Sequence, residues 1–470
     1  MLLIRDRPSF RRFAPLLSMA NITANTNLQV EITNRQILKI ALPISLALLV
    51  PQINFVTNNI FLSGLGETEL GTAGITGVFY LVFALVGNGL NSGLQGLISR
   101  RAGENRPEEI GKLFGQAIWI AMLFAGVGLI ITYLFTPYFL SASLHSPTVR
   151  SEATSFLIIR VTGLPFLYLF QLGNAFLVGT NSSRYMKYAF FIEATLNIFL
   201  DYVLINGYLG FPKLGFNGAA IASVIAEIVA VIVVFGIIIY KNMHRRFALF
   251  NSLRFNKTLA SLIFRQSSPL VLQFLLSIMA WLLFYVLIEN KGERPLAISN
   301  TMRNIFGLFG IFVWSFASTS NAMVSNIIGQ GKKDKVQPLI RKIMALSFTF
   351  TFFLCLLLNL FPDMFLSVFG RDDSFTAEAI PVIRMVSIGV LCMSVATVWL
   401  NAVTGTGNTR INLLIEIVAI SLYSIYIWLV LKIWNLSLVW AWASELLYWV
   451  VLFTLSFLYI RSGKWKKKII

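Results

Sequence analysis

The sequence predicts an all-α integral membrane protein with twelve transmembrane helices, arranged as two six-helix lobes. Three observations support this fold class. The chain is 57% hydrophobic and only 12% charged, whereas soluble domains carry about 25% charged residues. Long apolar runs recur along the chain, each of the length that crosses a bilayer. The second half also repeats the spacing of the first half.

Twelve apolar segments are long enough to span a bilayer, which takes about 20 residues. A bilayer offers the backbone no hydrogen bonds, so such segments form helices or closed barrels. Continuous rather than alternating apolar runs favour helices. We expect transmembrane helices at residues 36–62, 71–99, 110–135, 152–179, 185–209, 216–240, 259–288, 296–328, 338–361, 376–405, 411–434 and 437–460.

The basic residues indicate the orientation of these helices. The connections after even-numbered helices hold 18 Lys and Arg residues, and the alternate connections hold 6. Short loops rich in Lys and Arg stay in the cytoplasm, so we expect a cytoplasmic tail at 1–35 and a basic cytoplasmic tail at 462–470. This placement accounts for the net charge of +18 without a nucleic-acid partner. We predict a multi-pass protein of the plasma (cell inner) membrane with both termini cytoplasmic.

No motif points to an enzyme, a metal centre or an internal ATP drive. Cys355 and Cys392 lie in apolar segments without CxxC spacing, and His145 and His244 lie in connections. The basic start has its apolar stretches broken by charge, which argues against a cleaved signal peptide. We predict no enzyme activity and no cofactor.

The second half of the chain repeats the first at one constant offset. The offset pairs Pro43 with Pro269, Gly66 with Gly292, Gly179 with Gly405, Thr180 with Thr406 and Arg184 with Arg410. Because each half has an even number of helices, both halves enter the membrane from the same side, and a pseudo-twofold axis along the membrane normal relates them. The predicted lobes are 36–240 and 259–461, joined by a cytoplasmic linker at 241–258. A substrate cavity is expected between them.

Ionisable side chains inside spans are costly and mark functional sites or internal partners. In the first lobe, Asn197 and Asp201 share one helix face at i and i+4 and can converge on a proton or a small cation. The alternative is that Asp201 is locked in a structural polar contact. Glu193, one turn earlier, is either a relay or a group that snorkels to the interface, and Glu227 is a candidate relay or cavity partner.

Several motifs in fixed order resemble the multidrug and toxic compound extrusion (MATE) family. The strongest is "NIFLDYVLINGYLGFPKLGFNGAAIAS" at residues 197–223, with "ALPISLALLVPQINFVTNNIFLSGLG" in the first helix, "SRRAGENRPEEIGK" after the second and "GTGNTR" in the second half. The resemblance covers nearly the whole chain after residue 35. It implies a two-lobe transporter that exchanges H⁺ or Na⁺ for organic, often cationic, compounds.

One position departs from the family pattern. Many members carry an Asp in the first helix about fifteen residues after its proline, where this chain has Asn58 after Pro43. An amide oxygen can still ligate a cation. We therefore predict cation coupling at Asp201, Asn197 and Asn58, with Na⁺ a candidate ligand of Asp201 and Asn197, and Ser223 as a further relay or cavity candidate.

The offset sends Asn58 to Phe284, Asn197 to Tyr423 and Asp201 to Ile427. The polar cluster is therefore expected in the first lobe alone, and Tyr423 is a candidate for lining the substrate cavity or for plain packing.

Other polar residues in the spans have both structural and functional interpretations. Arg160 and Arg384 hold near-equivalent places, which favours a shared role in bracing a helix end against carbonyls. Glu416 and Glu445 either meet a cationic substrate, pair with each other or serve structure. Pro43 and Pro51 each remove a backbone donor and predict a bend in the first helix.

Two functions fit these features. The first is a secondary active antiporter that exports organic, cationic or amphiphilic compounds by alternating access in exchange for H⁺ or Na⁺. The alternative is a flippase for a lipid-linked precursor, which would line its cavity with cations, whereas the deep first-lobe charges are mainly acidic. We expect a small organic substrate and membrane lipid as partners, and a monomer.

Overall fold

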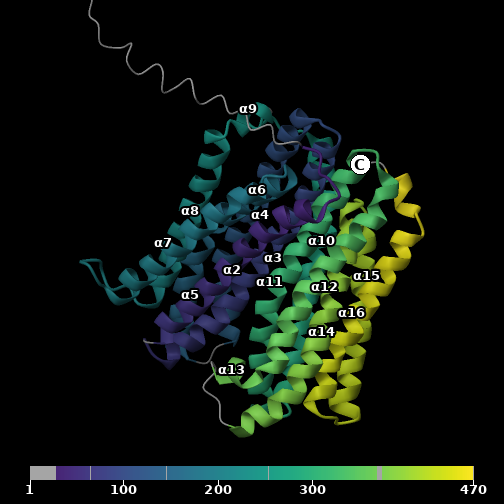
Figure 1. The fold of residues 1–470 in the computed structure, drawn as a ribbon. Coiled ribbons are helices and arrows are strands. Elements are labelled where there is room, and N and C mark those ends of the chain that lie inside the picture. The colour runs from purple at the N-terminus through teal and green to yellow at the C-terminus, as the bar shows by residue number, and fades with distance from the viewer. Residues whose placement is uncertain (1–27, 64, 144–145, 252, 368–372, 469–470) are drawn as a thin grey trace, which may run out of the picture.

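The computed structural model describes residues 28–63, 65–143, 146–251, 253–367 and 373–468, and in these ranges the regular structure is helical. The first lobe comprises α2 (Asn34–Ser63), α3 (Glu67–Gly103), α4 (Pro107–Ser143), α5 (Pro147–Val161), α6 (Leu164–Gly179), a short 3₁₀ turn (Ser183–Tyr185), α7 (Met186–Asn206) and α8 (Phe216–Tyr240). Its helices lie beside those of the second lobe, drawn in green to yellow (Figure 1).

The second lobe follows a four-residue helix, α9 (Met243–Arg246). It comprises α10 (Lys257–Glu289), α11 (Glu293–Gly329), a 3₁₀ turn (Lys333–Lys335), α12 (Val336–Leu360), α13 (Pro362–Ser367), α14 (Asp373–Gly405), α15 (Thr409–Trp428) with a π turn (Leu429–Ile433), α16 (Leu438–Arg461) and a final 3₁₀ turn (Lys464–Lys467).

Eleven of the described helices are long and apolar enough to cross a membrane, and the bent pair α5 and α6 makes a twelfth when it is counted as one span. The all-helical membrane fold with about twelve spans is thus confirmed. The structure differs at 152–179, where one straight span was expected and the two helices meet at 46°. Pro165 lies in the first turn of α6 and has no N–H to continue the helix from α5, which explains the break.

The helices keep the offset of the repeat. α3 and α11 have 37 residues each, and the offset that pairs Gly66 with Gly292 also carries both ends of α3 onto those of α11. α6 and α14 end at Gly179 and Gly405, which are themselves a pair of the repeat. The two lobes are therefore built from the same order of spans.

The segment between the lobes packs on the first lobe. Gln116 of α4 donates to the Arg254 carbonyl oxygen at 2.8 Å and accepts from the Asn256 N–H at 2.8 Å. Phe247 is buried with its ring 5.2 Å from that of Phe176. These contacts hold the start of α10 against α4.

The C-terminal turn is held on the 3₁₀ turn before α12. Lys466 forms a 2.7 Å ion pair with Asp334, and Lys333 donates to the Lys466 carbonyl oxygen at 2.7 Å. The hydrogen bond and charge of Lys466 hold the pKa of Asp334 below its usual range. The basic C-terminal segment is thus docked on the second lobe.

Candidate functional site

Asp201 lies on α7, in the first lobe. Its side chain has no exposed surface. The Asn58 amide of α2, oriented so that its nitrogen faces both acceptors, donates to Asp201 Oδ2 and to the Asn54 carbonyl oxygen at 3.2 Å. The structure therefore brings together two of the three predicted coupling residues, from helices far apart in the sequence.

Asn197 is also buried, one turn before Asp201, but it faces α8. Its Nδ2 lies 3.5 Å from Ser223 Oγ. α8 approaches α7 closely because Gly218 has no side chain, and a Cβ there would fall 2.8 Å from the Leu204 backbone. The predicted polar residues thus line the contacts of α7 with α2 and α8.

The Asp201 carboxylate is only partly satisfied. Its Oδ1 has no hydrogen-bond partner in the described part of the chain. An ionised carboxylate buried with one neutral donor costs several kcal/mol, and a proton or a small cation on the unpaired oxygen would remove that cost. Both species fit the chemistry of the surrounding amide and hydroxyl groups.

A second set of charges lies between α5, α8 and α3. Arg160 makes a bidentate ion pair with Glu227, at 2.9 Å and 2.6 Å. Tyr80 donates to Glu227 Oε1 at 3.3 Å, and the guanidinium lies 3.8 Å from the centre of the Tyr80 ring. Gly163, at the break after α5, leaves room for this pair, because a Cβ there would fall 2.3 Å from Glu227 Oε2.

The shared role expected for Arg160 and Arg384 was wrong. Arg160 pairs with a buried carboxylate rather than with helix-end carbonyls, whereas the Arg384 side chain is exposed. The two positions are near in the repeat, but their surroundings differ, since Arg160 faces the carboxylate of Glu227 and Arg384 is exposed. Glu227 is therefore engaged in an ion pair.

Glu193 lies on α7 near this pair. It is half-buried, and its Oε2 is enclosed without a hydrogen-bond partner among the described residues. The charges of Arg160 and Glu227 both act on it. Its enclosed oxygen argues against a group that snorkels to the interface, and its role as a relay stays a prediction.

The second lobe has a buried polar cluster as well, at other positions than the one predicted in the first lobe. Glu416 of α15 is buried and accepts hydrogen bonds from Ser277 at 2.6 Å, from Gln273 at 3.3 Å and from Tyr448. Asn412 donates to Gln273. The second lobe therefore has its own buried acid, built from α10, α15 and α16 at positions that the repeat offset does not relate to Asp201.

Tyr423 packs in the second lobe instead of facing an open cavity. It is buried, with ring contacts at 6.4 Å to Phe284 and 5.8 Å to Tyr448. Glu445 lies beside it and accepts from the Trp449 indole N–H at 3.0 Å. Glu445 and Glu416 therefore hold separate sets of donors.

Sequence reasoning missed Arg303, which lies within the span of α11. Its side chain is exposed, and its guanidinium lies 5.3 Å from the centre of the Tyr285 ring. Its position ten residues after the helix start was the available signal. Pro43 and Pro51 fall within α2, which is assigned as one helix from Asn34 to Ser63, so the bend there stays a prediction.

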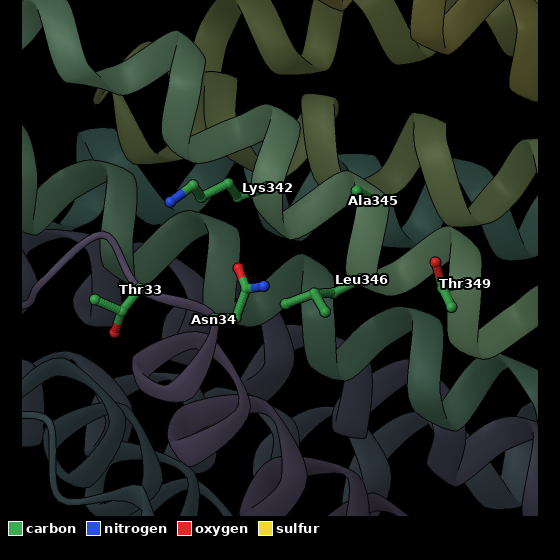
Figure 2. Close-up of a pocket in the computed structure, with 6 residues that line it drawn as sticks. All are labelled: Thr33, Asn34, Lys342, Ala345, Leu346 and Thr349. Carbon is green, nitrogen blue, oxygen red and sulfur yellow. The ribbon is translucent and has the colours of Figure 1, made fainter.

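An open groove of about 500 Å³ lies where α2 begins, against α12. Figure 2 shows Thr33 and Asn34 on one side, with Lys342, Leu346 and Thr349 on the other. None of the predicted coupling residues lines it. It is therefore distinct from the Asp201 site.

Comparison with known proteins connects this arrangement to one family. The MatE family model matches residues 43–203 and again 269–430. The two matches begin at Pro43 and Pro269, which the repeat offset pairs. Together they cover more than half of the chain and support the internal repeat.

Relatives and solved structures agree with the family model. A probable multidrug resistance protein NorM of Thermotoga maritima is 23% identical, over 94% of this chain and 95% of that protein. The multidrug resistance protein MdtK of Klebsiella pneumoniae is 27% identical over 40% of this chain and 41% of its own.

Solved structures show the same fold. A crystal structure of MATE in complex with MaL6 has a TM-score of 0.87 at 17% identity, over 94% of this chain and 99% of that one. An outward-facing conformation of a multidrug resistance MATE family transporter has a TM-score of 0.84 at 18% identity, over 94% and 98%. The chain therefore belongs to the MatE family of membrane transporters.

Proposed function

We propose that this protein is a secondary active antiporter that exports organic, cationic or amphiphilic compounds in exchange for H⁺ or Na⁺. The observation that carries the proposal is the Asp201 carboxylate, which is fully buried, touches Asn58 and keeps one oxygen without a partner in the described residues. The relatives are named as multidrug resistance proteins, which supports the substrate class.

Binding of a proton or Na⁺ at Asp201 gives the first lobe two electrostatic states. With the ion bound, the site is neutral and stable in the dry interior. Without it, the bare carboxylate favours an arrangement of α2, α7 and α8 that admits water. Alternation between these states couples the ion gradient to export, and the Asn58 amide stabilises the charged form through its hydrogen bond.

The test is transport in proteoliposomes with an imposed pH or Na⁺ gradient and a panel of organic cations. Asp201→Asn keeps the shape of the side chain but cannot change charge, so we expect it to fold and to lose gradient-driven export. The matched control is Glu378→Gln, the same chemical change at an exposed surface carboxylate, which we expect to transport at the parental rate. Export by Asp201→Asn at the parental rate would reject Asp201 as the coupling site.

We also propose that both termini and the even-numbered connections face the cytoplasm, as the basic residues suggest. Asn251, exposed in the segment between the lobes, offers a test. A cysteine introduced by Asn251→Cys should react with a membrane-impermeant maleimide in inside-out vesicles and not in intact cells. Labelling of intact cells would reverse the orientation.

The flippase alternative rests on Arg303, an exposed guanidinium within a span. A cation in that position suits an anionic headgroup, whereas Arg160 is neutralised by Glu227. The same proteoliposomes discriminate the two functions when an anionic lipid-linked substrate joins the panel. Flipping of that lipid, lost in Arg303→Gln, together with no transport of cations, would favour the flippase.

A further inference from the structure

The two lobes are joined by hydrogen bonds gathered at one end, where α3 and α11 finish. Each bond pairs a side chain with a group of the opposite lobe. The bonds run from Gln95 to the Ser318 carbonyl oxygen (2.8 Å), from Asn321 to the Ser92 carbonyl oxygen (3.0 Å) and from Ser325 to the Gly96 carbonyl oxygen (2.6 Å). This end is the seam between the lobes.

The helix backbones touch at the seam. A Cβ on Gly103 would fall 2.0 Å from the Asn326 carbonyl oxygen, and one on Gly329 would fall 2.3 Å from the Arg100 carbonyl oxygen. Gly103 and Gly329 are the last residues of α3 and α11 and are equivalent in the repeat. The cavity recorded beside Arg100 is about 10 Å³, the space of about one water molecule.

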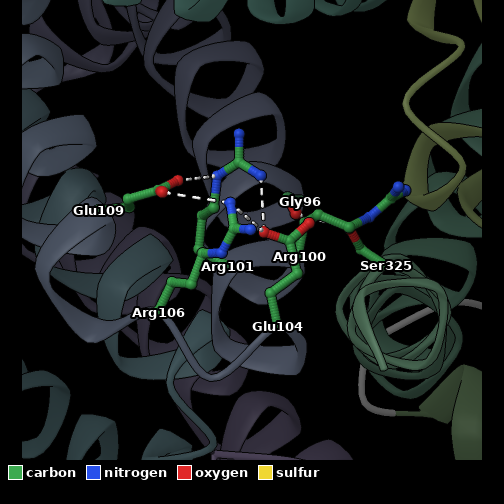
Figure 3. A network of polar contacts seen from close by, with 7 residues as sticks. All are labelled: Gly96, Arg100, Arg101, Glu104, Arg106, Glu109 and Ser325. Atoms are coloured by element: carbon green, nitrogen blue, oxygen red, sulfur yellow. Dashed lines mark hydrogen bonds and ion pairs between the residues drawn. The ribbon is translucent and has the colours of Figure 1, made fainter. Parts of the chain in front are cut away.

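Arg100 crosses the seam from α3 and caps the C-terminal end of α14. Its Nη2 donates to the carbonyl oxygens of Gly405 at 3.1 Å and Thr406 at 3.3 Å, and its Nε to Ser325 Oγ at 3.4 Å. The last carbonyls of a helix carry partial negative charge, which a cation stabilises. Figure 3 shows Arg100 directed toward Ser325, whereas Arg101 joins acids of its own lobe.

Asn326 holds the place in the second lobe that Arg100 holds in the first, but it has a different partner. Its Nδ2 donates to the Leu28 carbonyl oxygen at 2.8 Å, and its Oδ1 accepts from the Val30 N–H at 3.1 Å. Gln330 donates to the Val30 carbonyl oxygen at 2.9 Å. The second lobe therefore holds the backbone of residues 28–30, just before α2.

Residues 28–30 also bind the first lobe. Gln29 Nε2 donates to the Gly103 carbonyl oxygen at 3.0 Å. Leu28 and Val30 are 3% and 6% exposed, although they stand outside any helix. The segment, which we name the strap, lies across both lobes with its apolar side chains buried at the seam.

We propose that the strap at residues 28–30, hydrogen-bonded to Asn326, fastens the two lobes at the seam. The strap must then leave Asn326 whenever the lobes part there. The inference rests on the proposed alternating access, because that cycle requires the seam to open. Arg100 performs this task on one side of the pseudo-twofold axis by capping α14. Asn326 does so on the other side through the strap.

The test measures how often the seam opens. Ser92 lines the small cavity and is half-buried, so Ser92→Cys is the reporter, in a background of Cys355→Ala and Cys392→Ala. Inside-out vesicles are treated with a membrane-impermeant maleimide without substrate or ion gradient. The labelling rate is compared among the parent and the variants below.

Two variants loosen the strap by different means. Asn326→Ala removes both bonds to the strap, and Val30→Pro removes one N–H donor without touching α11. We expect each to raise the labelling rate about tenfold, equivalent to about 1.4 kcal/mol. Asn401→Ala, which removes an amide that donates to the Thr397 carbonyl oxygen of its own helix α14, is the matched control and should stay within about twofold of the parent.

Parental labelling in Val30→Pro and in Asn326→Ala, with both proteins eluting as folded monodisperse species, would overturn the proposal. If Asn326→Ala fails to fold, Val30→Pro alone decides the outcome. Because the assay uses neither gradient nor substrate, it is independent of the Asp201 transport test. A failure of one is distinguishable from a failure of the other.

Discussion

Glu227→Gln tests the ion pair of the first lobe directly. The variant keeps the shape of the side chain but leaves Arg160 without a carboxylate partner. The two side chains are 13% and 5% exposed, so the remaining guanidinium charge is buried. Breaking a buried pair by removing one partner costs about 3–5 kcal/mol, because the other charge is left uncompensated.

The structure places the expected cost near the lower end of that range. Arg160 keeps the face of the Tyr80 ring at 3.8 Å, which is worth about 0.5–2 kcal/mol, and the new amide oxygen still accepts one bond. We therefore expect a loss of about 3 kcal/mol in the free energy of unfolding. The double variant Arg160→Gln with Glu227→Gln removes both charges and should lose only about 1 kcal/mol.

The assay is equilibrium unfolding in mixed micelles, followed by circular dichroism, as a double-mutant cycle. The control is Glu378→Gln, whose pair with Arg294 is 54% and 39% exposed and should change stability by less than about 1 kcal/mol. The reasoning would be refuted by a Glu227→Gln protein as stable as this control. A double variant that loses the sum of the two single losses would refute it as well.

Three further predictions follow from the described contacts. Asn58→Ala removes the donor to Asp201 and should slow gradient-driven transport about tenfold, since a hydrogen bond to a charged group is worth about 1.5–3 kcal/mol; unchanged transport would exclude that bond from coupling. Gly93→Ala should destabilise the protein by about 1–3 kcal/mol, because a Cβ there lies 2.9 Å from the α10 backbone. Gly74→Ala places its Cβ in open space and should leave stability unchanged. Thermal unfolding in detergent measures both. The pKa of Asp334 is depressed in the folded protein, so its ion pair with Lys466 persists above the ordinary Asp pKa of about 3.9. The pair is lost only as pH falls through the lower folded pKa. A spin label on the C-terminal segment should therefore gain mobility only in that acidic range.

The spans could be predicted from the sequence because a bilayer requires long apolar helices. The expected span at 216–240 coincides with α8, and the one at 296–328 falls within α11. The break between α5 and α6 was not expected, because hydropathy does not register how Gly163 and Pro165 together end a helix. Hydropathy predicts which residues cross the membrane but not the angle at which each helix lies.

The site was predictable only where one helix carried the pattern. Asp201 and Asn197 share α7, so their spacing alone made them candidates, and the family resemblance added Asn58. The Glu416 cluster draws neutral donors such as Ser277 and Tyr448 from separate helices, and their convergence depends on how each helix is rotated. The pairing of Arg160 with Glu227 depends on the same rotations.

The strap escaped prediction for another reason. Its sequence, with polar residues around Leu28 and Val30, has no periodicity and reads as part of a tail. Side chains far away along the chain, Asn326 and Gln330, bind the backbone of those residues and give them a fixed place. Contacts of this kind depend on the meeting of the two lobes and have no local signal.

The crossing of α3 and α11 at Gly103 and Gly329 also bears on electrical insulation. A membrane potential of 100 mV is worth about 2.3 kcal/mol for each elementary charge that crosses, so a transporter that leaks ions dissipates the gradient that drives it. At this crossing backbone meets backbone, with a cavity of about 10 Å³ beside it, which is too small for a continuous file of water. A methyl group at either glycine would push the two helices apart, so we expect it to open a path for water and ions and to lower the membrane potential that the closed transporter can hold.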